Sequence, residues 1–133
     1  MTHGLAIMCQ FLADLQFTMG NIEQALSFAQ EFNQLEQYLY QECRNVVAYI
    51  DGLAISYQLL GKIHLNRNEL ENARDAFEKQ LALQEEAYTV DKQNMDYKKG
   101  VATAYSNLSR VYESLNDMPK ANYYYQKHLD YGQ

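Results

Sequence analysis

Apolar residues recur along this chain at steps of three, four and seven, the spacing that places side chains on one face of an α-helix. One stripe occupies 55–65 and another 70–88, formed by Ile55, Leu59, Leu60, Ile63 and Leu65, then by Leu70, Ala73, Phe77, Leu81 and Tyr88. The alternation that marks a half-buried strand is absent, and turn-forming residues are scarce. The pattern therefore predicts helices and no sheet.

Short polar segments separate the predicted helices. The first break is Gly20-Asn21, the second spans 66–68, and the third spans 116–119. Pro119 falls in the first turn of the following helix, where its missing N–H leaves no hydrogen bond unmade. Asn94 is predicted to cap the helix that follows it, because an asparagine side chain accepts hydrogen bonds from the first turn.

The chain repeats itself with a period of 48 residues. A shift of this length aligns many identical residues without a gap, and three columns are identical in all copies: Ala6/Ala54/Ala102, Leu12/Leu60/Leu108 and Ala25/Ala73/Ala121. A shared helical period would align similar residues, but not so many identities. Each copy holds two predicted helices, so we expect a single domain over 1–133 with repeats at approximately 1–44, 45–92 and 93–133.

The shared columns resemble the tetratricopeptide (TPR) signature, in which W-x2-L-G-x2-Y precedes A-x3-F. The second copy has Tyr57, Leu60, Gly61, His64, Ala73 and Phe77 in these columns, and the third has Tyr105, Leu108, Ser109, Tyr112, Ala121 and Tyr125. The first copy fits less well, with Cys9, Leu12, Ala13, Gln16, Ala25 and Ala29. The resemblance implies an all-α fold in which three antiparallel helical hairpins stack as a short right-handed solenoid.

The repeat period is longer than the roughly 34 residues usual for this family. We expect longer helices to account for the difference, because no breaker lies between Glu69 and about Val90. Tyr125 is expected in the core, with Tyr123 and Tyr124 either covering a neighbouring element or facing a further repeat. No polar capping helix is visible, so the chain is expected to be a fragment of a longer array. A plain three-hairpin bundle is the alternative fold.

Composition narrows the functional classes. The chain is 47% hydrophobic and 21% charged, as in ordinary soluble domains. It carries 17 Asp and Glu against 11 Lys and Arg, which disfavours nucleic-acid or anionic-membrane partners. No basic leader segment or long apolar run is present. In the first hairpin, Cys9 and Cys43 would be offset by about 18 Å along the helix axis, which is beyond the reach of a disulfide. Free thiols in the cytoplasm are therefore expected.

Residue patterns for catalysis and metal binding are missing from the sequence. The three histidines, His3, His64 and His128, are scattered, and neither HExxH nor Cys-x2-Cys occurs. His64 occupies a packing column, so a hydrogen-bonded core histidine is the favoured interpretation. The chain is therefore not expected to be an enzyme, and no cofactor or metal is predicted.

The resemblance also implies a binding surface, because the first helix of each TPR hairpin lines a concave face. Carried over by position, the inward-facing columns comprise Ile7, Gln10, Phe11, Asp14, Phe17 and Thr18 in the first copy, Ile55, Gln58, Leu59, Lys62, Leu65 and Asn66 in the second, and Thr103, Ser106, Asn107, Arg110, Glu113 and Ser114 in the third. Phe11 and Leu59 are the expected anchor pocket for a partner, and Lys62, Asn107 and Arg110 the expected donors. Alternatively, Phe11, Phe17 and Leu59 are buried under a further helix or a neighbouring subunit.

These observations favour a protein–protein interaction module that binds a peptide or protein segment in the concave groove and acts in assembly or regulation. The carboxylate clamp of some TPR proteins is not reproduced, since Asp14, Gln58 and Thr103 stand in its polar columns. The alternative is a structural scaffold segment of a larger protein, such as a bacterial signalling or effector protein. That alternative implies homo-oligomers formed through the hairpin ends.

Overall fold

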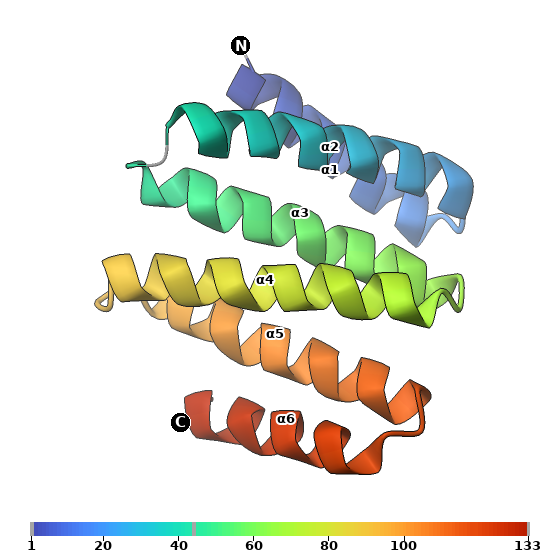
Figure 1. Cartoon of the computed structure of the whole chain (residues 1–133). Helices are drawn as coiled ribbons and strands as arrows, with labels where there is room; N and C mark the ends of the chain where they lie inside the picture. Colours follow the sequence, from blue (N-terminus) through green and yellow to red (C-terminus); the bar gives the residue numbers. More distant parts are fainter. Residues whose placement is uncertain (1, 44, 133) are drawn as a thin grey trace.

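Six α-helices make up the described part of the chain. The computed structural model describes residues 2–43 and 45–132, with α1 (Thr2–Thr18), α2 (Ile22–Glu42), α3 (Val47–Asn66), α4 (Leu70–Val90), α5 (Met95–Ser114) and α6 (Met118–Tyr131). Figure 1 shows successive helices running back and forth and stacking in chain order, with α1 at one end and α6 at the other. The predicted all-α, solenoid-like stack of three hairpins is confirmed.

The turn inside each hairpin contains one residue with left-handed backbone. These residues are Gly20, Asn68 and Asn116, with φ of 85°, 61° and 63°, and they lie 48 positions apart. Glycine and asparagine adopt this conformation at the least cost, so their occurrence at equivalent positions explains why the helices end there. All three predicted breaks are therefore confirmed.

The predicted caps and helix lengths also agree with the structure. Asn94 accepts hydrogen bonds from the backbone N–H groups of Asp96, at 2.9 Å, and Tyr97, at 3.4 Å. Pro119 lies in the first turn of α6. Helix α4 runs unbroken over 21 residues. The long repeat period thus reflects long helices, as predicted.

Small residues allow the two helices of each hairpin to approach closely. The alanine columns at Ala6/Ala54/Ala102 and Ala25/Ala73/Ala121 are buried throughout. In the second hairpin the ring of Phe77 lies over Gly61, so close that an added Cβ would fall 2.6 Å from Cδ1 and 2.8 Å from Cζ. Leu108 and Val111 of α5 pack in the same cluster as Phe77. Phe77 therefore links the second hairpin to the third.

The expected core position of Tyr125 is wrong. Tyr125 is exposed, although its equivalent Phe77 is buried. Ser109 stands where the second repeat has Gly61, and its hydroxyl donates to the carbonyl oxygen of Ala121 at 2.8 Å. The space that admits a ring in the second hairpin is thus closed in the third. Tyr124 packs inward instead and stacks on Tyr112 at a centroid distance of 5.5 Å.

Two further expectations concern single side chains. Cys9 and Cys43 are both free thiols, as predicted. His64 is partly buried, and its Nδ1 lies 2.7 Å from Oε1 of Glu69, so it is a hydrogen-bonded packing residue. None of the helices formed by residues 2–43 and 45–132 combines the length and the apolar character needed to cross a membrane.

Candidate binding groove

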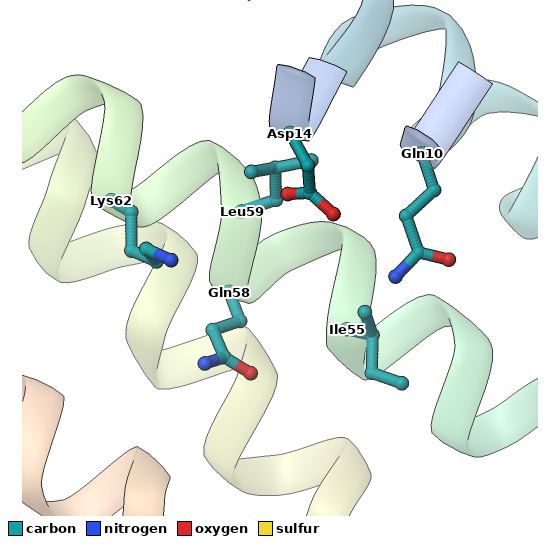
Figure 2. Close-up of a pocket in the computed structure, with 6 residues that line it drawn as sticks. All are labelled: Gln10, Asp14, Ile55, Gln58, Leu59 and Lys62. Carbon is teal, nitrogen blue, oxygen red and sulfur yellow. The ribbon is translucent and has the colours of Figure 1, made fainter. Parts of the chain in front are cut away.

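A hollow of about 190 Å³ lies between α1 and α3. Its lining consists of Gln10, Asp14, Ile55, Gln58, Leu59 and Lys62. Figure 2 shows that Gln10 and Asp14 reach from α1 toward the space bordered by the four side chains of α3. The first helices of two consecutive hairpins therefore form this hollow together.

A second hollow extends the same surface toward α5. It has a volume of about 270 Å³ and is lined by Phe17, Lys62, Leu65, Asn66 and Arg110. Lys62 borders both hollows, so the two are neighbours on this surface. We call the combined surface the groove, and it is formed by α1, α3 and α5.

The 48-residue repeat explains why these side chains meet. Gln10 and Gln58 occupy equivalent positions, as do Asp14 and Lys62. Equivalent residues on stacked helices point to the same side, so each pair lies along one line of the groove. The repeat thus brings two amides, a carboxylate and an ammonium group into the lining of one hollow.

Cationic side chains dominate the far end of the groove. The Nζ of Lys62 lies 5.7 Å from the ring centroid of Phe17, within the range of a cation–π contact. Lys62 and Arg110 are exposed, and neither forms an ion pair within the described part of the chain. Both charges therefore remain available to an acidic or amide group of a ligand.

A chain of hydrogen-bonded amide side chains runs from Gln58, which lines the first hollow, into the core. Gln80 of α4 is fully buried and donates from Nε2 to Oε1 of Gln58 at 3.3 Å. Its own Oε1 accepts from Nδ2 of Asn107 at 3.2 Å. The expectation that Asn107 is a free donor is therefore corrected: it is buried, and its amide is engaged with Gln80. Gln80 was missed in the sequence analysis. The one hint of a buried polar contact is that an amide stands at the position where the first repeat has the apolar Phe32.

Other predicted site residues lie beside the groove or beneath it. Ile7 and Phe11 are exposed on α1 but line neither hollow, and Thr103 is half-buried and also lines neither. Leu59 does line the first hollow, yet it is only 4% exposed and belongs to the core between α1, α2 and α3. An anchor pocket formed by Phe11 and Leu59 is therefore not what the structure shows.

Two further hollows lie outside the groove. One of about 340 Å³ lies between α5 and α6, and one of about 250 Å³ lies between α3 and α4. Each is confined to a single hairpin. Among residues 2–43 and 45–132, no three His, Cys, Asp or Glu side chains converge as a metal ion would require.

Comparisons with known proteins give one match to a family model, over a single segment of the chain. Residues 54–87, covering most of α3 and α4, match the family model described as tetratricopeptide repeat. No curated protein sequence matches this chain. Among solved structures, the crystal structure of MamA protein is 15% identical over 96% of this chain and 91% of that chain, with a TM-score of 0.24. At this TM-score the two structures do not superimpose as a whole, and no function is inferred from the comparison.

Proposed function

We propose that this chain, a tetratricopeptide-like repeat protein, binds an extended segment of another protein in the groove formed by α1, α3 and α5. Repeats of this family generally mediate protein–protein interactions. The observation that carries the proposal is the convergence of repeat-equivalent polar side chains, Gln10 with Gln58 and Asp14 with Lys62, on one hollow.

The lining suits an extended peptide better than a compact small molecule. Gln10 and Gln58 offer amide groups that can donate to and accept from a peptide backbone. Ile55 lines the first hollow and Leu65 lines the second. Each supplies apolar surface for a different side chain of the ligand. A peptide lying along the groove would therefore contact α1, α3 and α5 at once.

Charge gives the ligand a preferred direction and composition. Lys62 and Arg110 favour a ligand with a carboxylate toward α5, whereas Asp14 favours a basic or amide group toward α1. Exposed charges act mainly on the rate of encounter and are screened by salt. Binding is therefore expected to weaken as ionic strength rises. The two free thiols support a reducing compartment such as the cytoplasm.

The test is selection of binders from a random peptide library displayed on phage, followed by fluorescence anisotropy with the selected peptides. The variant Lys62→Glu/Arg110→Glu is expected to lose at least about tenfold in affinity, which corresponds to about 1.4 kcal/mol. Both residues are exposed, so the circular dichroism of the helices should not change.

A matched control is Lys79→Glu. The Nζ of Lys79 lies 5.3 Å from the ring centroid of Tyr57, a contact much like that of Lys62 with Phe17, but it borders the hollow between α3 and α4. This variant is expected to bind the selected peptides as wild type does. Equal affinity in wild type and in Lys62→Glu/Arg110→Glu would show that the groove is not the binding surface.

A further inference from the structure

The side of α1 that faces away from α2 carries an uncovered apolar stripe. Its members are Leu5, Met8, Phe11 and Leu15, which are between 41% and 65% exposed. We call this set the α1 stripe. Lone apolar residues on a surface are ordinary, but four at helical spacing along one helix form a continuous face.

The equivalent residues in the other two repeats are buried. A shift of 48 takes the α1 stripe to Leu53, Ser56, Leu59 and Ile63 on α3, and a second shift takes it to Val101, Ala104, Asn107 and Val111 on α5. None of these eight residues is more than 7% exposed. The same face is thus covered twice within the chain and uncovered once.

The second helix of the preceding hairpin provides the cover in both cases. On α3, Ser56 accepts from Nδ2 of Asn33 in α2 at 2.8 Å, and Leu59 packs with Phe32 of α2. On α5, Val111 packs in the same cluster as Phe77 of α4. A helix of the same kind as α2 and α4 is therefore the element that fits the α1 stripe.

The glycines at equivalent positions in the three repeats also show that α1 lacks the neighbouring helix that covers α3 and α5 among the described residues. The side chain of Glu36 in α2 lies against Gly52, and that of Gln84 in α4 lies against Gly100. Gly4 is the third member of this column, and a Cβ added there would meet no atom within 4 Å. The place that α2 and α4 occupy in the later repeats is open beside α1.

Helix α6, at the opposite end of the stack (Figure 1), is itself a second helix with an uncovered outer face. Tyr125 and Leu129 are 54% and 39% exposed. Their equivalents in α4 are Phe77, which is buried, and Leu81, which packs against the cluster shared with α5. Over Tyr125 and Leu129, α6 thus exposes the face that α4 uses to cover α5, and it ends at Tyr131, one residue before the position equivalent to Gln84.

The charges of the two ends are compatible with their meeting. The hairpin of α1 and α2 contains no Lys or Arg, and its acidic residues are Asp14, Glu23, Glu31, Glu36 and Glu42. The hairpin of α5 and α6 contains five basic residues, Lys98, Lys99, Arg110, Lys120 and Lys127, against four acidic ones. Long-range attraction therefore favours contact between unlike ends and opposes contact between two α1–α2 ends.

We propose that α6 of one molecule packs on the α1 stripe of a second copy of this chain, in the position that α2 takes on α3 and α4 takes on α5. Such a contact joins unlike surfaces, so it continues the stack from one molecule to the next instead of closing a symmetric dimer. It leaves the groove of each molecule unused and does not rest on the function proposed above.

The experiment measures sedimentation velocity of the full chain and of two blocked variants. Met8→Glu/Leu15→Glu blocks the α1 stripe, and Tyr125→Glu/Leu129→Glu blocks the outer face of α6. All four side chains are exposed, so the variants should keep the helical circular dichroism of wild type. The mass of wild type is expected to rise over an about hundredfold range of concentration, as mass action requires for a self-associating protein.

Mixing the two variants tests whether α6 of one molecule contacts the α1 stripe of another. Each variant alone is expected to stay monomeric, with association weakened at least about a hundredfold because charged side chains would be desolvated in the contact. An equimolar mixture retains one intact α6 face and one intact α1 stripe, so it should form a one-to-one dimer. A wild type that stays monomeric overturns the proposal. So does association of the α6 variant by itself, which would indicate contact between two α1 stripes.

Discussion

The carboxyl group of Glu36 in α2 lies directly against Gly52 in α3, and a Cβ built on Gly52 would fall 3.0 Å from Cδ of Glu36. Glu36 is 3% exposed, and its Oε2 has no hydrogen-bond partner among the described residues. Burial, with a smaller contribution from the charge of Asp51, raises the pKa of Glu36 to about 7. The next repeat has the neutral Gln84 at the equivalent position.

Glu36→Gln is expected to stabilise the protein at alkaline pH. Between the ordinary carboxyl pKa of 4.5 and about 7, the folded state holds a proton that the unfolded state has lost. The free energy of unfolding of wild type therefore falls as pH rises through this interval. Above a pH of about 7, the full cost of burying the ionised carboxylate of Glu36 is reached. The variant should be more stable by about 1–3 kcal/mol at high pH and nearly equal to wild type at low pH. Urea unfolding at both pH values measures the difference.

Glu42→Gln is the control for this effect, since Glu42 is an exposed carboxylate on the same helix. In this variant, the free energy of unfolding should change between the two pH values by as much as it does in wild type. If Glu36→Gln showed the same pH dependence as wild type, the buried carboxyl group would not be the source of it.

Gly61→Ala is expected to destabilise the second hairpin. The new Cβ would lie within 2.8 Å of the Phe77 ring, which is buried and packed against α5 and cannot move away without disturbing that contact. Overpacking of this kind costs about 1–3 kcal/mol. Thermal unfolding measures the loss.

The matching substitution Gly4→Ala should act in the opposite direction. Nothing lies near this position, and alanine is the better residue inside a helix by about 0.5–1 kcal/mol. A loss of stability in Gly4→Ala as large as that in Gly61→Ala would mean that contact with Phe77 is not the cause.

The hydrogen bond between Gln80 and Asn107 invites a double-mutant cycle. Gln80→Met or Asn107→Leu each leaves a buried amide without its partner, and each is expected to cost about 1–3 kcal/mol. The double variant resembles the apolar pair Phe32 and Leu59 at the preceding junction between hairpins. It should therefore be destabilised by less than the sum of the single variants, as measured by urea unfolding. Additive losses would argue against coupling between the two amides.

Burial raises the pKa of four of the twelve tyrosines, and Tyr105 and Tyr112 should ionise last in an alkaline titration. Burial raises the pKa of Tyr105 to about 12, and burial together with a hydrogen bond from its hydroxyl to Glu78 raises that of Tyr112 to about 12. The folded state thus favours the neutral ring, and this stabilisation is lost as pH rises through about 12. Tyrosinate absorbance follows the titration, and Glu78→Gln should lower the pKa of Tyr112 while leaving Tyr105 unchanged.

The hairpins and their boundaries could be predicted because they depend on local rules. Helical spacing locates each helix, and left-handed residues recur at Gly20, Asn68 and Asn116. The core position of Tyr125 was mispredicted because it depends on a residue in another helix. Whether a ring can enter is decided by Gly61 or Ser109, and a column taken by itself does not show this.

The binding groove stays a prediction, but several residues predicted to line it do surround one hollow. The repeat columns identify Gln10, Asp14 and Lys62, because equivalent residues keep their direction from one hairpin to the next. The details differ because neighbouring helices differ between repeats: among residues 2–43 and 45–132 no helix covers Phe11 on α1, whereas Asn107 is buried against Gln80. The buried Glu36 was missed because an acidic residue within a helix resembles a solvated one.

The order of the helices in space follows their order along the chain. Within residues 2–43 and 45–132, packed helices are neighbours or next neighbours in sequence. Contacts this local require no long loop to close, so the chain can fold quickly and open from either end while the remainder persists. Helix α3 is packed on both sides, and it contributes most of the groove. The groove therefore lies mainly on a helix that is held between two others, and amide exchange is expected to be slowest there.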